Sequence, residues 1–200
     1  MAAIDGDLDV PAGATGIVLF AHGMGSGRNS VRNRMVAGGL RDAGLATLLV
    51  DLARHDQRFD IDLLAGRLLE ITAELAARDD TGPLPLGLFG ASTGGGAALV
   101  AAARAPQRVR AVVSRGGRPD LAGAALGRVE APTLLLVGGA DPVVLELNQA
   151  ALRQLRCEKH LSVVPGATHL FEEPGTLEQV ATEARDWFVG HLGGEGSGHG

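Results

Sequence analysis

The residues best suited to chemistry in this chain are a serine, an aspartate and a histidine, each placed directly after a predicted strand. Ser92 is central in the run Gly-Ala-Ser-Thr-Gly at residues 90–94, between a short apolar run and an alanine-rich segment. This spacing is typical of a sharp strand-to-helix turn with the serine hydroxyl at its apex. Glycines are needed there because a Cβ would clash where the two backbones meet. A tight connection without catalytic function is the alternative interpretation.

A serine hydroxyl near neutral pH needs a base to accept its proton, and the base needs an anion to orient it. His169, in the strand-to-helix loop Gly-Ala-Thr-His-Leu-Phe at 166–171, is the predicted base. Asp141, in Gly-Ala-Asp-Pro-Val-Val at 139–144, is the predicted anion, with Asp120 as its rival. The chain order serine, aspartate, histidine is the one expected after a serine turn of this kind.

A tetrahedral intermediate at the serine would carry a negative charge, which requires preorganised N–H donors. The backbone N–H of Thr93, directly after the serine, is one predicted donor. The second is the backbone N–H of Met24, in the glycine-rich loop that follows the apolar strand expected at residues 16–21. His22 precedes this loop, and we interpret it as a structural histidine that holds the loop.

Apolar runs that alternate with helical segments predict an α/β fold with a mostly parallel sheet of about six to seven strands and helices on both faces. Ligands bind beyond the carboxyl ends of such strands, so Met24, Ser92, Asp141 and His169 should gather at one edge. One domain is expected over residues 1–192, followed by a flexible glycine-rich tail at 193–200. Strands are expected at 4–10 (an edge strand), 16–21, 45–51, 109–114, 131–138 and 160–164, and one more begins at residue 85. Helices are expected at about 30–43, 60–77, 93–104 and 176–192, and one more ends at about residue 155.

Composition restricts the function classes. The chain has 200 residues, of which 46% are hydrophobic and 20% charged, as expected for a soluble globular protein. A net charge of −5 without a basic run argues against nucleic-acid binding, and no apolar stretch is long enough to span a membrane. The single cysteine and the absence of a signal-peptide pattern favour a cytoplasmic location. No His/Cys/Asp cluster has metal-ligand spacing, so no metal is expected.

The motifs together resemble a known family. The runs Phe-Gly-Ala-Ser-Thr-Gly-Gly-Gly at 89–96 and Ala-His-Gly-Met-Gly at 21–25, with those around Asp141 and His169, resemble the α/β-hydrolase superfamily. The likeness is greatest to its compact branch of proteins similar to dienelactone hydrolases, and it covers nearly the whole chain. It implies a hydrolase with an α/β-hydrolase fold and without a metal or organic cofactor. Dienelactone hydrolases proper use a cysteine nucleophile, whereas Ser92 here favours a general carboxylesterase.

Three further residues are predicted to contact the substrate. Only residues 115–132 lie where many relatives insert a cap domain, so an open, shallow site without a cap is expected. Arg115 and Arg54, on loops at the predicted edge, could clamp a substrate carboxylate, with Arg115 the first choice. A surface arginine that bonds loop carbonyls is the alternative. Leu170 is a candidate for the apolar wall of an acyl pocket.

The sequence therefore predicts a serine hydrolase that cleaves small carboxylic esters through an acyl-enzyme intermediate. Two alternatives remain at this point. The same three residues could serve acyl transfer or thioester cleavage, or the chain could be a hydrolase-like binding protein without catalysis. The expected partner is a small ester, and the chain is expected to be a monomer or a homodimer.

Overall fold

Seven strands form one sheet in the computed structural model, which describes residues 4–22, 27–52 and 60–193. The strands are β1 (Gly6–Asp9), β2 (Ile17–Ala21), β3 (Ala46–Val50), β4 (Leu86–Ala91), β5 (Val109–Arg115), β6 (Thr133–Gly138) and β7 (Lys159–Val164). Their spatial order is β1-β3-β2-β4-β5-β6-β7. Strand β1 pairs antiparallel with β3, and the other pairs are parallel. The predicted mostly parallel sheet, with an edge strand near the N-terminus, is confirmed.

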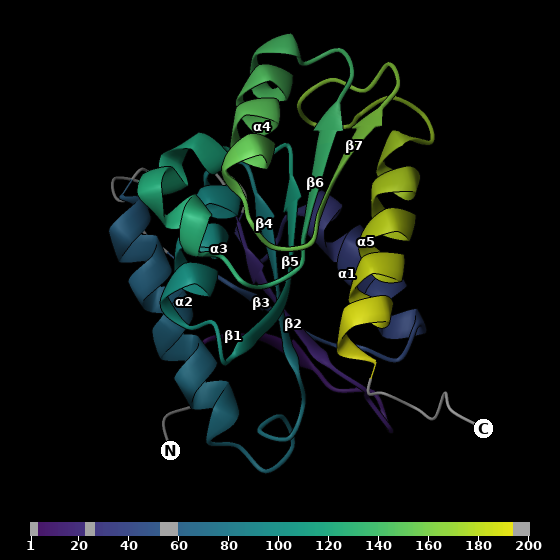
Figure 1. Ribbon diagram of the computed structural model, residues 1–200. Helices are drawn as coiled ribbons and strands as arrows, with labels where there is room; N and C mark the ends of the chain where they lie inside the picture. Colours follow the sequence, from purple (N-terminus) through teal and green to yellow (C-terminus); the bar gives the residue numbers. More distant parts are fainter. Residues whose placement is uncertain (1–3, 23–26, 53–59, 194–200) are drawn as a thin grey trace, which may run out of the picture.

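Helices cover both faces of this sheet (Figure 1). They are α1 (Val31–Asp42), α2 (Ile61–Ala76), α3 (Thr93–Arg104), the 3₁₀ segment η1 (Pro119–Arg128), α4 (Pro142–Gln154) and α5 (Thr176–Leu192). Helices α1 and α5 lie on one face, whereas α2, α3, η1 and α4 lie on the other. The predicted three-layer α/β arrangement is therefore present, and the predicted helix boundaries differ from the observed ones by only a residue or two.

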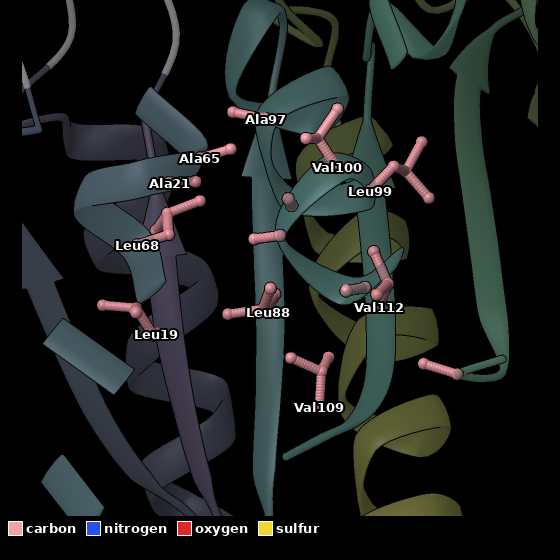
Figure 2. Close-up of a cluster of buried hydrophobic side chains, with 14 of the residues drawn as sticks. Leu19, Ala21, Ala65, Leu68, Leu88, Ala97, Leu99, Val100, Val109 and Val112 are labelled. Atoms are coloured by element: carbon pink, nitrogen blue, oxygen red, sulfur yellow. The ribbon is translucent and has the colours of Figure 1, made fainter. Parts of the chain in front are cut away.

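The sheet is buried on both faces because its parallel strands are apolar along their whole length. Figure 2 shows the cluster under α2 and α3, where Leu19, Leu88 and Val112 of neighbouring strands meet Leu68 and Leu99 of the helices. A second cluster, which includes four of the five phenylalanines, fills the space under α1 and α5. Burial of this apolar area supplies most of the driving force for folding and fixes the strands whose ends carry the polar residues of interest.

Polar residues cap the first turns of α1 and α2. Ser30 precedes α1, and its hydroxyl accepts a hydrogen bond from the backbone N–H of Asn33 at 3.4 Å. Asp60 precedes α2, and its carboxylate accepts one from Leu63 at 2.9 Å. Such caps satisfy N–H groups that have no partner inside the helix. Gly44 follows α1 with φ of +81°, a conformation that glycine adopts at little cost.

The direction in which successive strands are added to the sheet reverses at β2. The chain passes from β2 through α1 to β3 on one side, and then through α2 to β4 on the other side of β2. In open α/β sheets a crevice forms at the carboxyl ends of the strands where connections diverge in this way. His22 follows β2 and Ser92 follows β4, so both residues lie at this point of the fold.

The segment between β5 and β6 forms no separate domain. Its η1 segment packs against α3 and α4 in the helical layer. The expectation that this insertion is too short for a cap agrees with the structure. Among the described residues, no helix is both long and apolar enough to cross a membrane.

Gly94 lies where the backbones of β2 and α3 come into contact, so we expect a side chain at this position to destabilise the protein. A Cβ built on Gly94 would overlap the carbonyl oxygen of Ala21 and lie 2.9 Å from that of His22. Backbone atoms cannot move aside as a side chain can, so Gly94→Ala should lower the free energy of unfolding by about 2–3 kcal/mol. Urea denaturation measures this change.

Gly66 in α2 is the matched control, since nothing lies within 4 Å of a Cβ built there. Gly66→Ala should raise the free energy of unfolding by about 0.5–1 kcal/mol, because alanine loses less backbone entropy in a helix. Equal effects of the two substitutions would contradict the close approach of β2 and α3.

Candidate active site

Ser92 lies between β4 and α3 in a strained backbone conformation, with φ of +52° and ψ of −123°. Phe171 is the only other non-glycine residue with a positive φ in the described part of the chain. Residues with a Cβ avoid this region, so the surrounding structure must hold the serine there. The Ser92 hydroxyl does not cap α3, although the residue occupies the cap position. This local geometry is that of the predicted strand-to-helix turn.

Backbone hydrogen bonds tie Ser92 to the chain that follows β5. Its N–H donates to the carbonyl of Arg115 at 3.3 Å, and its carbonyl accepts from the N–H of Arg118 at 3.0 Å. Behind this connection, the buried Asn148 of α4 donates from Nδ2 to the carbonyl of Gly117 at 3.0 Å. These bonds fix both peptide groups that flank the serine.

Asp141 follows β6 and uses its two carboxylate oxygens for different tasks. Oδ1 accepts a hydrogen bond from the backbone N–H of Val144 at 3.4 Å and so caps α4, with Pro142 at the first helical position. Oδ2 lies 2.7 Å from Nδ1 of His169. The helix cap therefore fixes the carboxylate that faces the imidazole.

His169 lies in the loop between β7 and α5 and is partly exposed. With a proton on Nδ1, the ring donates to Asp141, which leaves Nε2 as the basic nitrogen. Two contacts hold this loop: Ala140 donates its N–H to the carbonyl of Ala167 at 2.9 Å, and Glu173 accepts hydrogen bonds from the N–H and hydroxyl of Thr168 at 3.0 and 2.6 Å. These hydrogen bonds hold the pKa of the Glu173 carboxyl below its usual value.

The end of β5 lies between the serine and the histidine. Arg115 accepts the hydrogen bond from Ser92, and the next residue, Gly116, contacts the histidine loop. A Cβ built on Gly116 would lie 3.2 Å from the His169 carbonyl oxygen and 3.6 Å from its ring carbon Cε1. Ser92, Asp141 and His169 thus follow β4, β6 and β7 at one edge of the sheet, as the parallel topology predicts.

Of the two predicted oxyanion donors, the structure describes only Thr93. Thr93 is the first residue of α3, and N–H groups at a helix start have no partner within the helix. Met24 and Arg54 lie outside the described residues. Gly94 lies in close contact with Ala21 and His22, so these two described residues lie beside the start of α3.

His22 and Asp120 form hydrogen bonds with other parts of the chain. Nε2 of His22 accepts a hydrogen bond from the N–H of Leu52 at 2.9 Å, in agreement with the structural role expected for this histidine. Asp120 pairs through both carboxylate oxygens with Arg118, at 2.9 and 2.7 Å. Asp141 is the aspartate that faces His169.

Arg115 differs from the expectation. It is the last residue of β5 and not part of a loop, and only 5% of it is exposed. Its Nη2 donates to Oδ1 of Asn33 at 3.3 Å, and its guanidinium carbon lies 5.8 Å from the ring centre of Phe171. Burial and the nearby Arg32 lower the pKa of Arg115 to about 10, so it remains charged near neutral pH. The expected surface arginine is thus a buried cation.

Several exposed apolar side chains lie at the same edge as Ser92. Val31 begins α1 and is 81% exposed, Val143 lies two residues after Asp141 and is 69% exposed, and Leu170 follows His169 and is 40% exposed. Leu170 is therefore accessible, as a wall of an acyl pocket requires, although its contact with substrate stays a prediction.

Sequence reasoning missed three residues that support the site: Asn33, Phe171 and Glu173. A signal existed for Asn33, because it occupies the first position of the buried stripe Asn33, Val36, Ala37 and Leu40 in α1. A polar residue in such a stripe indicates a buried hydrogen bond. The other two carry no comparable pattern in the sequence.

A cleft of about 690 Å³ lies away from these residues, at the amino ends of β4, β5 and β6, where Pro85, Val109 and Pro132 line it. Ligands of parallel sheets bind at the opposite edge, so we do not assign this cleft to the chemistry. Within the described ranges, no group of three His, Cys, Asp or Glu residues could hold a metal ion.

The parallel sheet, the strained serine turn and the aspartate–histidine pair define the α/β-hydrolase class. Comparison with known proteins gives the family. The model of the dienelactone hydrolase family matches residues 50–188. The chain belongs to the dienelactone hydrolase family, and its family and fold support hydrolase chemistry.

Solved structures agree with this assignment. A dienelactone hydrolase from Anabaena variabilis is 57% identical, with a TM-score of 0.91 over 94% of this chain and 91% of that one. The structure of Est1E from Butyrivibrio proteoclasticus with ferulic acid bound is 18% identical with a TM-score of 0.82, over 94% of this chain and 95% of that one. The second likeness concerns the fold alone.

A curated relative from Mycobacterium tuberculosis is 61% identical over 96% of this chain and is named "Putative phosphoribosyl transferase". The chain spans only 45% of the length of that relative. Because more than half of the relative has no counterpart here, its name does not decide the activity of the part that matches.

Proposed function

We propose that this chain is a serine esterase that cleaves small carboxylic esters through an acyl-enzyme intermediate. The observation that carries the proposal is the 2.7 Å contact between Asp141 Oδ2 and His169 Nδ1 at the edge where the strained Ser92 turn lies. A carboxylate that orients an imidazole beside a serine provides the base that serine needs to act as a nucleophile.

In the first half of the reaction, the Ser92 hydroxyl attacks the ester carbonyl and Nε2 of His169 accepts its proton. Asp141 stabilises the imidazolium that forms. The backbone N–H groups of Thr93 and Met24 stabilise the negative oxygen of the tetrahedral intermediate. Its collapse breaks the bond to the leaving alcohol, which takes the proton from His169.

In the second half, His169 removes a proton from water, which attacks the acyl group on Ser92. Collapse of this second intermediate releases the carboxylic acid, and the proton returns to the serine. No step requires a metal or an organic cofactor. Small or flexible esters suit the site best, since the segment between β5 and β6 packs beside α3 and forms no cap. Leu170 would contact the acyl group, and Arg54 would favour anionic substrates.

A fluorophosphonate probe and a panel of p-nitrophenyl esters test this proposal. The probe should label Ser92 covalently, and acetate should be released faster than long acyl chains because a shallow site buries little of them. Mass spectrometry locates the label, and initial rates give kcat/KM for each ester.

The same experiment separates the alternatives. Transfer of the acyl group to an added alcohol, in preference to water, would indicate an acyltransferase. Faster turnover of thioesters than of oxygen esters would indicate a thioesterase. Absence of both labelling and turnover in folded protein would favour a binding protein and contradict the proposal.

A further inference from the structure

Arg115 is a buried cation that forms no ion pair with a carboxylate in the described part of the chain. Its guanidinium contacts Oδ1 of Asn33 and faces the ring of Phe171, while its Nε has no hydrogen-bond partner. The nearby Arg32 adds a like charge. Burial of a charge without a counter-charge costs free energy, so Arg115 is not explained by stability alone.

Phe171, on which the guanidinium packs, is itself strained. Its φ is +54°, and only 2% of it is exposed. A bulky residue enters the left-handed region only where its surroundings force it to. The strain lies two residues after His169, in the same loop. Two unfavourable features, a buried unpaired cation and a left-handed phenylalanine, are therefore in contact beside the histidine.

The contacts of Gly116 connect this pair to His169. A Cβ built on Gly116 would lie 3.4 Å from Cε2 of Phe171 and 3.2 Å from the His169 carbonyl oxygen. Gly116 has φ of +51°, and its N–H donates to the carbonyl of Leu136 at 2.7 Å. The end of β5 is therefore a rigid support, against which the Phe171 ring and the histidine loop pack.

We propose that Arg115 is a positioning residue for His169: its guanidinium, oriented by Asn33, packs on the Phe171 ring and holds the histidine loop in the conformation that keeps Nδ1 on Asp141. This role depends on the proposed esterase function, because it assigns a task within that mechanism. A cation over an aromatic ring gains more when it is desolvated, which suits a buried pair. Errors of about 1 Å in the placement of a reacting group reduce rates by about 100-fold.

The competing role for Arg115 is a clamp for a substrate carboxylate. Only 5% of Arg115 is exposed, and its guanidinium contacts Asn33 and Phe171. The guanidinium therefore lies in the core under α1 and α5 and does not face solvent. The two roles differ in their kinetics. A clamp acts only on anionic substrates and mainly through KM, whereas a positioning residue acts on every substrate through kcat.

The test compares Arg115→Met and Phe171→Leu on p-nitrophenyl acetate, which is neutral, and on p-nitrophenyl hemisuccinate, which is anionic. Each variant should lower kcat by about 10- to 100-fold on both esters and leave KM unchanged. The double variant should lose no more than the worse single variant, because both remove one contact. Arg110→Met is the matched control, because Arg110 lies exposed on the same strand. The kcat of this variant should equal that of the wild type.

Thermal unfolding separates positioning from a loss of structure. Arg115→Met should raise Tm, because an unpaired buried charge is replaced by an apolar chain of similar length. Phe171→Leu should lower Tm, because it leaves a cavity. Opposite effects on Tm with the same effect on kcat exclude general destabilisation as the cause.

The NMR signal of the Nδ1 proton shared by His169 and Asp141 provides a readout that does not depend on turnover. It should be visible in the wild type and broadened or lost in both variants. A loss restricted to the anionic ester, or an unchanged proton signal with normal kcat, would overturn the positioning role. A wild type that shows the proton signal but has no activity would instead contradict the esterase proposal.

Discussion

Ser92→Ala should reduce ester hydrolysis by about 1,000,000-fold, the largest effect expected for any single substitution in this chain. Alanine removes the atom that forms the acyl-enzyme bond, and only the oxyanion donors and substrate binding remain. Initial rates with p-nitrophenyl acetate measure the loss, and the fluorophosphonate probe should no longer label the protein.

Two further serine variants control for structure. Ser162 lies within β7, which is separated from β4 by β5 and β6 in the sheet, so Ser162→Ala should keep full activity. Ser92→Gly should be as inactive as Ser92→Ala but should have a higher Tm, because glycine adopts φ of +52° without strain. Substantial hydrolysis by Ser92→Ala would show that another group is the nucleophile.

Asp141→Asn should lower kcat by about 10,000-fold while the stability of the protein changes little. The amide cannot stabilise an imidazolium and favours the wrong tautomer of His169. Asparagine caps helices as well as aspartate does, so it can still accept the hydrogen bond from Val144 at the start of α4. Steady-state kinetics and urea denaturation on the same sample measure the two effects.

Asp141→Ala separates the two tasks of this carboxylate. It should lose activity to a similar degree and also lower the free energy of unfolding by about 1 kcal/mol, because the cap is lost. Asp120→Asn is the matched control: Asp120 pairs with Arg118, and its replacement should leave kcat within a fewfold of the wild type. If Asp120→Asn instead lost activity by about 10,000-fold, Asp120 and not Asp141 would be the carboxylate that supports catalysis.

Much of the fold could be predicted because the apolar runs are long and uninterrupted. Runs such as 133–138 are buried along their whole length, and the alternation of such runs with helices leaves a parallel sheet as the main solution. Asp141 and His169 could be paired from the sequence because each follows a strand, and parallel strands deliver such residues to one edge. In the structure Nδ1 of His169 lies 2.7 Å from Oδ2 of Asp141, and the catalytic roles of the two residues stay predictions.

The setting of Arg115 could not be predicted in the same way. An arginine directly after an apolar run suggests the end of a strand and exposure to solvent, since arginine is almost never fully buried without a partner. Here the strand continues through Arg115, whose pairing with Ala91 and Leu136 of the neighbouring strands places it inside the sheet. Its burial depends on Asn33 and Phe171, which are far from it in the chain.

The strain at Phe171 was equally hidden from sequence. Phenylalanine has no preference for the left-handed region, so its φ of +54° follows only from the tertiary packing of the loop. The hydrogen bonds between Glu173 and Thr168 also depend on this loop conformation. Features that tertiary contacts impose against local preference cannot be inferred from local patterns.

The left-handed backbone conformation of Ser92 has a practical consequence for protein engineering. Glycine at position 92 would relax the backbone, so libraries screened only for survival at high temperature are expected to enrich this change. Such clones would refold readily after heating and yet turn over no ester. A search for heat-tolerant forms of this domain should therefore keep Ser92 fixed and direct mutagenesis to positions such as Gly66.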